Sequence, residues 1–94
     1  MGFTVRNLAN TAWAFATLGQ SDEKLFAALA VAAEQRVRDF AAQNLANMAW
    51  AFAKMGHLDE KLFAALAKAA ERQVGKFNPQ ELANTAWAFA TAGQ

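Results

Sequence analysis

The sequence predicts an all-α fold, an αα-hairpin solenoid of five helices in the order A-B-A-B-A. Three observations favour it: a Leu-Ala-Asn motif begins at positions 8, 45 and 82, apolar residues recur with the period of a helix, and a glycine follows each motif segment. The motif spacing gives a period of 37 residues, from 45 − 8 and from 82 − 45. Each repeat is therefore expected to be a helical hairpin, an A helix followed by a B helix.

The repeat covers nearly the whole chain. Residues 3–39 and 40–76 are identical at 24 of 37 aligned positions, and residues 77–94 form a third half-copy. We expect a single helical-repeat domain over residues 1–94. Because each hairpin buries its apolar face only against its neighbours, stability should come from contacts between repeats.

The A segments have the stripe and the stop signals of amphipathic helices. In the first copy Leu8, Ala12 and Phe15 fall on one face, while Asn10 and Thr17 face the other way. Each A helix is expected to end at a glycine in the left-handed conformation, and these glycines are Gly19, Gly56 and Gly93.

The third A segment also has a clear start. Asn78 is a candidate N-cap, Pro79 suits the first helical turn, and Glu81 completes a capping-box pattern. Thr4 holds the same place in the first copy, so at least two A helices are expected to begin with a polar cap.

The B segments begin with acidic residues at 22–23 and 59–60, which suit the positive end of a helix dipole. These helices are expected to run to about Val37 and Val74. A phenylalanine just before each A segment is placed to staple that segment to the preceding B helix, and the three are Phe3, Phe40 and Phe77.

Composition limits the possible functions. The net charge of +1 gives no strong basic field for a polyanion, and the absence of cysteine excludes disulfides and thiolate metal sites. The single histidine, His57, is expected on the surface at a helix end. No nucleophile-base set or glycine-rich phosphate loop can be assembled, so we expect no enzyme, no metal and no cofactor. No apolar run approaches the roughly 18 residues of a membrane span, and no targeting peptide is expected.

Candidate binding residues form three parallel ladders on the polar side of the A helices. Spacings of three and four residues align side chains on one helix face. The first ladder is Arg6, Asn10, Trp13 and Thr17, the second is Gln43, Asn47, Trp50 and Lys54, and the third is Gln80, Asn84, Trp87 and Thr91. The amides offer donors and acceptors to a base edge, the cations could neutralise phosphates, and an indole could stack on a base.

Each ladder residue type also has a purely structural interpretation. Trp at the border of an apolar stripe more often belongs to the core between repeats, and this is the interpretation we favour for the three tryptophans. The recurring Asn could instead hydrogen-bond between neighbouring A helices. Arg6 and Lys54 could simply be solvated charges.

The A segments read LANTAWAFATLG at 8–19, LANMAWAFAKMG at 45–56 and LANTAWAFATAG at 82–93. They resemble the octotricopeptide and heptatricopeptide repeats of organellar RNA-binding proteins, which occur in RAP-domain-associated arrays. The resemblance covers essentially the whole chain, although the proline-rich segment common in algal octotricopeptide repeats is replaced by residues 21–24. It implies binding of single-stranded RNA in chloroplasts or mitochondria.

Two functions remain open from the sequence. One is a single-stranded RNA-binding module, which the resemblance favours. The other is a protein-protein interaction scaffold that binds an extended peptide, which the low net charge favours. Leu82, Trp87 and Phe89 repeat the internal pattern with no B segment after them, so we also expect either end-to-end self-assembly or a longer parent array.

Overall fold

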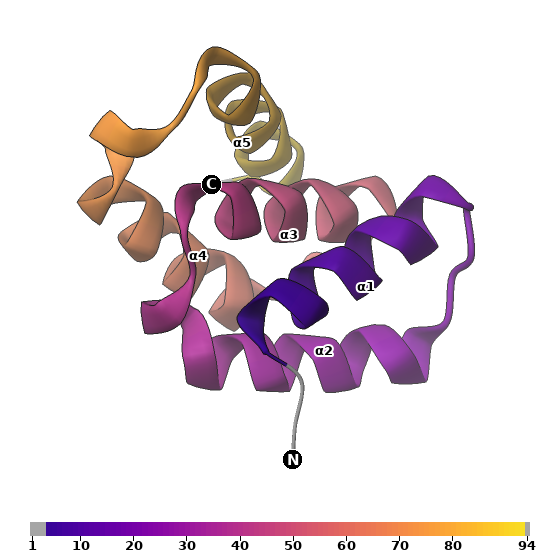
Figure 1. Ribbon diagram of the computed structural model, residues 1–94. Helices are drawn as coiled ribbons and strands as arrows, with labels where there is room; N and C mark the ends of the chain where they lie inside the picture. The colour runs from indigo at the N-terminus through magenta and orange to yellow at the C-terminus, as the bar shows by residue number, and fades with distance from the viewer. Residues whose placement is uncertain (1–3, 94) are drawn as a thin grey trace.

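The computed structural model describes residues 4–93, and in that range the chain is all-helical, with five α-helices and no strand (Figure 1). The α-helices are α1 (Val5–Thr17), α2 (Glu23–Arg36), α3 (Ala42–Lys54), α4 (Glu60–Arg72) and α5 (Pro79–Ala92). Two short 3₁₀ helices, η1 (Val37–Asp39) and η2 (Val74–Lys76), precede α3 and α5. The predicted all-α class and the predicted number of helices are confirmed for the described residues.

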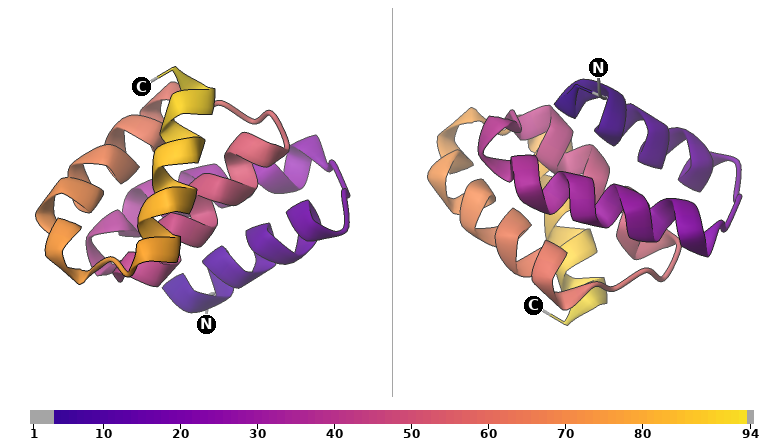
Figure 2. Two further views of the ribbon diagram at one scale, coloured as in Figure 1. Left: turned by 90° about the horizontal axis from the view of Figure 1, so that it is seen from above. Right: turned by 90° about the horizontal axis from the view of Figure 1, so that it is seen from below.

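The A helices α1, α3 and α5 pack side by side in chain order, and α3 has the most extensive contacts because it touches both of the others. The B helices α2 and α4 pack against each other and against the A helices. In Figure 2, α5 crosses over α3 in the view from above, and α2 lies at the front in the view from below. In Figure 1, α3 lies between α5 on one side and α1, α2 and α4 on the other.

Glycines end the A helices, as the sequence predicts. Gly19, Gly56 and Gly93 have φ angles of 71°, 74° and 80°, which is the left-handed region. Beyond Gly19, the Gln20 N–H donates to the Phe15 carbonyl at 2.9 Å, and the His57 N–H donates to the Phe52 carbonyl at the same distance. These bonds satisfy carbonyls that would otherwise be left unpaired at the helix ends.

The starts of the A helices differ among the three copies. The Thr4 hydroxyl accepts from the Asn7 N–H at 3.1 Å, and Asn78 and Glu81 form a reciprocal capping box. Both predictions are confirmed. Ala41 occupies the cap position of α3 and cannot accept a bond through its side chain, so α3 keeps only half of the box, in which Asn44 Oδ1 accepts from the Ala41 N–H at 3.0 Å.

The B helices begin where the acidic residues predict, and the carboxylates also act as caps. Asp22 accepts from the Leu25 N–H and Asp59 from the Leu62 N–H, each at 3.0 Å. The helices end at Arg36 and Arg72, slightly before the expected ends, because the chain tightens there into η1 and η2.

Phenylalanines join successive repeats with the same geometry. Phe26 of α2 packs edge-on against Phe52 of α3 at 5.1 Å between ring centroids, and Phe63 of α4 packs against Phe89 of α5 at 5.9 Å. The two pairs are one repeat apart, since both residue numbers rise by 37. Each B helix is thus fixed to the A helix that follows it.

The expected staples also lie in the core. Phe40 and Phe77 are buried before α3 and α5, whereas the third staple, Phe3, lies outside the described residues. The Gln73 side chain donates to the Phe40 carbonyl at 2.6 Å, which links the end of α4 to the start of the second repeat. The bond joins two residues that are 33 positions apart in the sequence.

Candidate ligand-binding face

The ladder residues line a polar depression, which we call the central hollow. Its volume is about 210 Å³, and it is bordered by side chains from α1, α3, the start of α5 and its cap residue. The lining consists of Trp13, Gln43, Asn47, Asn78, Gln80, Glu81 and Asn84. Five of these seven residues are predicted ladder residues, contributed by all three A helices. The packing of α3 between α1 and α5 is what brings them together.

A second depression, the lateral hollow, adjoins the central one because both include Gln43. It has a volume of about 450 Å³ and lies where the first turns of α1 and α3 meet. Arg6 and Asn10 contribute from α1, and the remaining lining residues are Ala41, Gln43 and Asn44. A continuous polar surface therefore runs across the N-terminal halves of the A helices.

The other ladder residues do not line either hollow. Thr17, Trp87 and Thr91 are exposed on α1 and α5. Trp50 is half-buried against the core, and the Lys54 ammonium lies over its ring at 5.6 Å from the centroid. This cation-π contact places a positive charge near an aromatic surface at the C-terminal half of α3.

The favoured interpretation of the tryptophans as core between repeats is wrong for two of them. Trp13 and Trp87 are 46% and 47% exposed. In α1 the buried positions are Leu8, Ala9, Ala12 and Ala16, so Trp13 falls just outside the stripe. Trp13 lies instead at the central hollow, which its side chain helps to line. Of the three tryptophans, all of which lie in the described range, only Trp50 packs against the core.

The three ladder asparagines do not form a hydrogen-bonded structural ladder. Asn10 is exposed, while Asn47 and Asn84 are half-buried at the central hollow. Within residues 4–93 none of their side chains has a hydrogen-bond partner. Their donors and acceptors are therefore available to a ligand or to water.

Cap residues complete the hollows and were not among the predicted ladder residues. Asn44, Asn78 and Glu81 all line one of the two depressions. Their side chains are already engaged in capping α3 and α5, so each has only part of its bonding capacity left. Their positions in the sequence could have identified them, because Asn44 is next to Gln43, and Asn78 and Glu81 lie within two residues of Gln80.

The charges around the two hollows are sparse and mixed. Arg6 contributes one positive charge and Glu81 one negative charge. No group of three or more potential metal-ligating His, Cys, Asp or Glu side chains occurs within residues 4–93. No helix in the same range is long and apolar enough to cross a membrane. The lining of the two hollows otherwise consists mostly of neutral hydrogen-bonding groups.

His57 differs from its expected place on the surface. It follows the last turn of α3 but is half-buried, and its ring stacks on Phe26 with centroids 4.9 Å apart and planes 10° apart. It also meets Phe52 edge-on at 6.3 Å. The imidazole thus extends the aromatic contact between the repeats and lies away from both hollows.

Comparison with known proteins gives one family. No curated protein matches the chain. The family model of the RNA-editing substrate-binding complex 6 protein matches residues 2–93, nearly the whole sequence. This model is not an octotricopeptide or heptatricopeptide model, so the comparison retains the connection with RNA but gives those repeat families no support. The chain belongs to the RNA-editing substrate-binding complex 6 protein family.

Proposed function

We propose that this protein is a binding module for single-stranded RNA, without catalytic activity, and that the RNA lies across the A-helix face, which is the surface of α1, α3 and α5 that carries the ladder residues. The central hollow carries the proposal, because it gathers unpaired amides and an exposed indole from α1, α3 and α5. Its volume of about 210 Å³ is below the ~300 Å³ of the smallest typical small-molecule pockets. Such a hollow suits one base or one backbone group of an extended ligand.

The side chains have the chemistry that single-stranded RNA requires. Asn47, Asn84 and Gln43 can each donate and accept hydrogen bonds at a base edge or a ribose hydroxyl. Trp13 offers an exposed ring to an unstacked base, and base stacking on an aromatic side chain contributes about 1–3 kcal/mol. Arg6 at the lateral hollow can neutralise a phosphate.

The family and the repeat pattern support this proposal. The name of the family refers to a complex that binds RNA-editing substrates. We extend this role to the present chain and propose that it takes part in RNA metabolism. We further infer that the five helices are a short segment of an αα solenoid, since the Phe26–Phe52 contact recurs one period later.

A fluorescence titration with mixed-sequence single-stranded RNA at 50 and 200 mM salt tests the proposal. Two phosphate contacts, from Arg6 and Lys54, predict a slope of about −1.4 in log K against log salt, and so about a sevenfold loss of affinity over this range. The double variant Arg6→Ala/Lys54→Ala should bind with almost no salt dependence. Asn47→Ala/Asn84→Ala should weaken binding at both salt concentrations.

A matched control removes two cations that lie on α2 and η1. Lys24→Ala/Arg38→Ala changes the net charge equally, and both side chains are exposed outside the A-helix face. This variant should keep the wild-type salt slope. If it loses as much affinity as Arg6→Ala/Lys54→Ala, the contact with RNA is not located on the A-helix face and the proposed site is wrong.

A protein-protein interaction scaffold is the second candidate, and the net charge of +1 favours it. Unpaired Asn side chains on the A helices could hold the backbone of an extended peptide instead of a base. If RNA fails to bind at high micromolar concentration while Asn47→Ala/Asn84→Ala abolishes capture of an unstructured peptide, the face is assigned to peptide.

A further inference from the structure

The central and lateral hollows are equivalent sites in two successive repeats. The lateral hollow is lined by Arg6, Asn10, Ala41, Gln43 and Asn44. Adding one period of 37 to each number gives Gln43, Asn47, Asn78, Gln80 and Glu81, and all five of these residues line the central hollow. The two sites can therefore be compared position by position.

This comparison shows that the two hollows carry opposite charges. Among the described residues, Arg6 is the charged side chain that lines the lateral hollow, and its equivalent in the central hollow is the neutral Gln43. Glu81 is the charged side chain that lines the central hollow, and its equivalent in the lateral hollow is the neutral Asn44. A phosphate is therefore favoured at the lateral hollow and a base at the central hollow, where Trp13 also offers its ring.

The half-buried carboxylate of Glu81 has one oxygen free for a ligand. Its Oε1 accepts from the Asn78 N–H at 3.0 Å, and this bond fixes the side chain at the start of α5. Its Oε2 has no hydrogen-bond or ion-pair partner within residues 4–93. An ionised carboxylate only accepts hydrogen bonds, whereas the amides of the hollow both donate and accept. Glu81 is therefore the residue of the central hollow that distinguishes a donor on the ligand from an acceptor.

We infer that Glu81 makes the central hollow select a base with an exocyclic amino group, which adenine, cytosine and guanine carry and uracil lacks. The amino group projects from the ring and can donate to Oε2, as the N4 amino group of cytosine donates to carboxylates in other complexes. In uracil the ring N3–H lies between two carbonyl oxygens, which the carboxylate repels. The inference rests on the proposed binding of RNA and specifies which bases this face prefers.

The test compares oligocytidine with oligouridine of the same length, in fluorescence titrations with the full 94-residue chain. Both bases are pyrimidines, so ring size does not differ between them. The wild type should bind oligocytidine about tenfold more tightly, which corresponds to one hydrogen bond to a charged group. Glu81→Gln should reduce this ratio to within about twofold, because an amide also offers a donor. The glutamine oxygen can still accept from the Asn78 N–H, so the variant should keep the wild-type circular dichroism.

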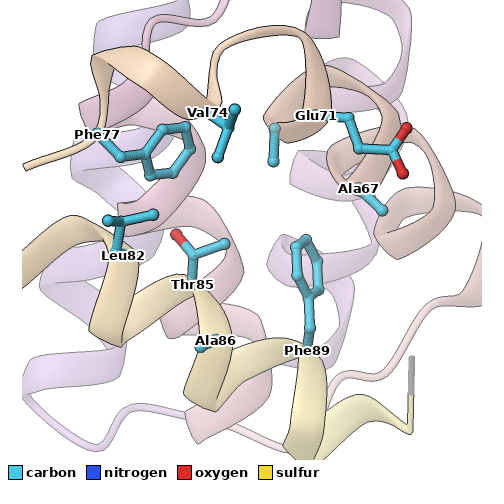
Figure 3. A pocket seen from close by; sticks show the side chains of 9 residues that line it. Ala67, Glu71, Val74, Phe77, Leu82, Thr85, Ala86 and Phe89 are labelled. Carbon is cyan, nitrogen blue, oxygen red and sulfur yellow. The ribbon is translucent and has the colours of Figure 1, made fainter.

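Glu71→Gln is the matched control, because it removes an equal charge from a different site. Glu71 lies on α4 beside an apolar pocket that Phe77 and Leu82 help to line, and its carboxylate points away from the middle of that pocket (Figure 3). Glu71 lines neither of the two hollows. This variant should therefore keep the wild-type preference for oligocytidine.

The possible failures of the inference and of the proposed function are distinct. Equal affinity of the wild type for the two oligonucleotides, or a preference that Glu81→Gln leaves unchanged, would overturn the role of Glu81 and leave RNA binding in place. Loss of the preference in Glu71→Gln would also overturn it, because the preference would then follow the net charge. Binding of neither oligonucleotide at high micromolar concentration would overturn the proposed function itself.

Discussion

Helices α3 and α5 carry nearly the same sequence but lie in very different surroundings. The segments at 45–56 and 82–93 differ at only three positions, yet eight residues of α3 are buried and only two of α5. α3 is covered by α1, α4 and α5, while α5 contacts α3 extensively and α4 much less. Burial in this fold is thus a property of the neighbouring repeat, and the same substitution should have different effects in the two helices.

The largest expected effect comes from the repeated phenylalanine. Phe52→Ala removes a fully buried ring that packs against Phe26 and should lower the free energy of unfolding by about 3–5 kcal/mol. Phe89→Ala removes a partly buried ring and should cost about 1–2 kcal/mol. Urea denaturation followed by circular dichroism measures both. Equal losses would show that α5 is packed as well as α3 in solution.

The second effect concerns a position at which the two helices differ. Met48→Thr places in α3 the residue that α5 has, shortening a fully buried side chain and adding a hydroxyl. The free energy of unfolding should fall by about 2–4 kcal/mol. Met48→Leu, which keeps the volume and adds no polar atom, serves as the control and should cost under about 1.5 kcal/mol. A Thr variant as stable as the Leu variant would contradict complete burial at this site.

The reverse change in α5 should stabilise the protein. Thr85→Val removes the unpartnered hydroxyl while keeping the shape of the side chain, and should raise the free energy of unfolding by about 1 kcal/mol. Thr11→Val at the half-buried equivalent in α1 should change it by less than about 0.5 kcal/mol. The prediction fails if Thr85→Val destabilises the protein in urea denaturation, since Thr85 must then have a partner in solution.

The smallest effect comes from the helix starts. Ala41→Asn gives α3 the cap that α5 has in Asn78, and it should complete the box of which Asn44 already forms half. The expected gain is about 0.5–1 kcal/mol, measured by thermal and urea denaturation. Asn78→Ala should lose a similar amount. If Ala41→Asn brings no gain, the lone Asn44 bond already satisfies the start of α3.

Much of the fold was predictable because its signals are local. The glycine stops at Gly19 and Gly56 and the cap at Asn78 depend on a few neighbouring residues, and all three are confirmed. The exposure of Trp13 was not predictable in the same way. It depends on how closely α1 and α3 approach, and the sequence pattern alone places an indole equally well inside or outside that contact.

The candidate site shows the same division between local and long-range information. Helical spacing was enough to align Asn10 with Arg6 on one face, and both line the lateral hollow. The central hollow also includes Asn78 and Glu81, because the start of α5 lies beside α3 in space. That proximity is set by the packing between repeats, which spacing within one helix does not contain.

The recurring phenylalanine contact also has a consequence for the order in which the chain is made. Phe26 packs against Phe52, and Phe63 packs against Phe89. In each pair the phenylalanine of the B helix is therefore synthesised 26 residues before its partner in the following A helix, from 52 − 26 and 89 − 63. At a synthesis rate of about 5–20 residues per second, this interval lasts about 1–5 s. During that time each newly made B helix exposes its apolar stripe, and the emerging chain is most vulnerable to aggregation just before the next A helix leaves the ribosome.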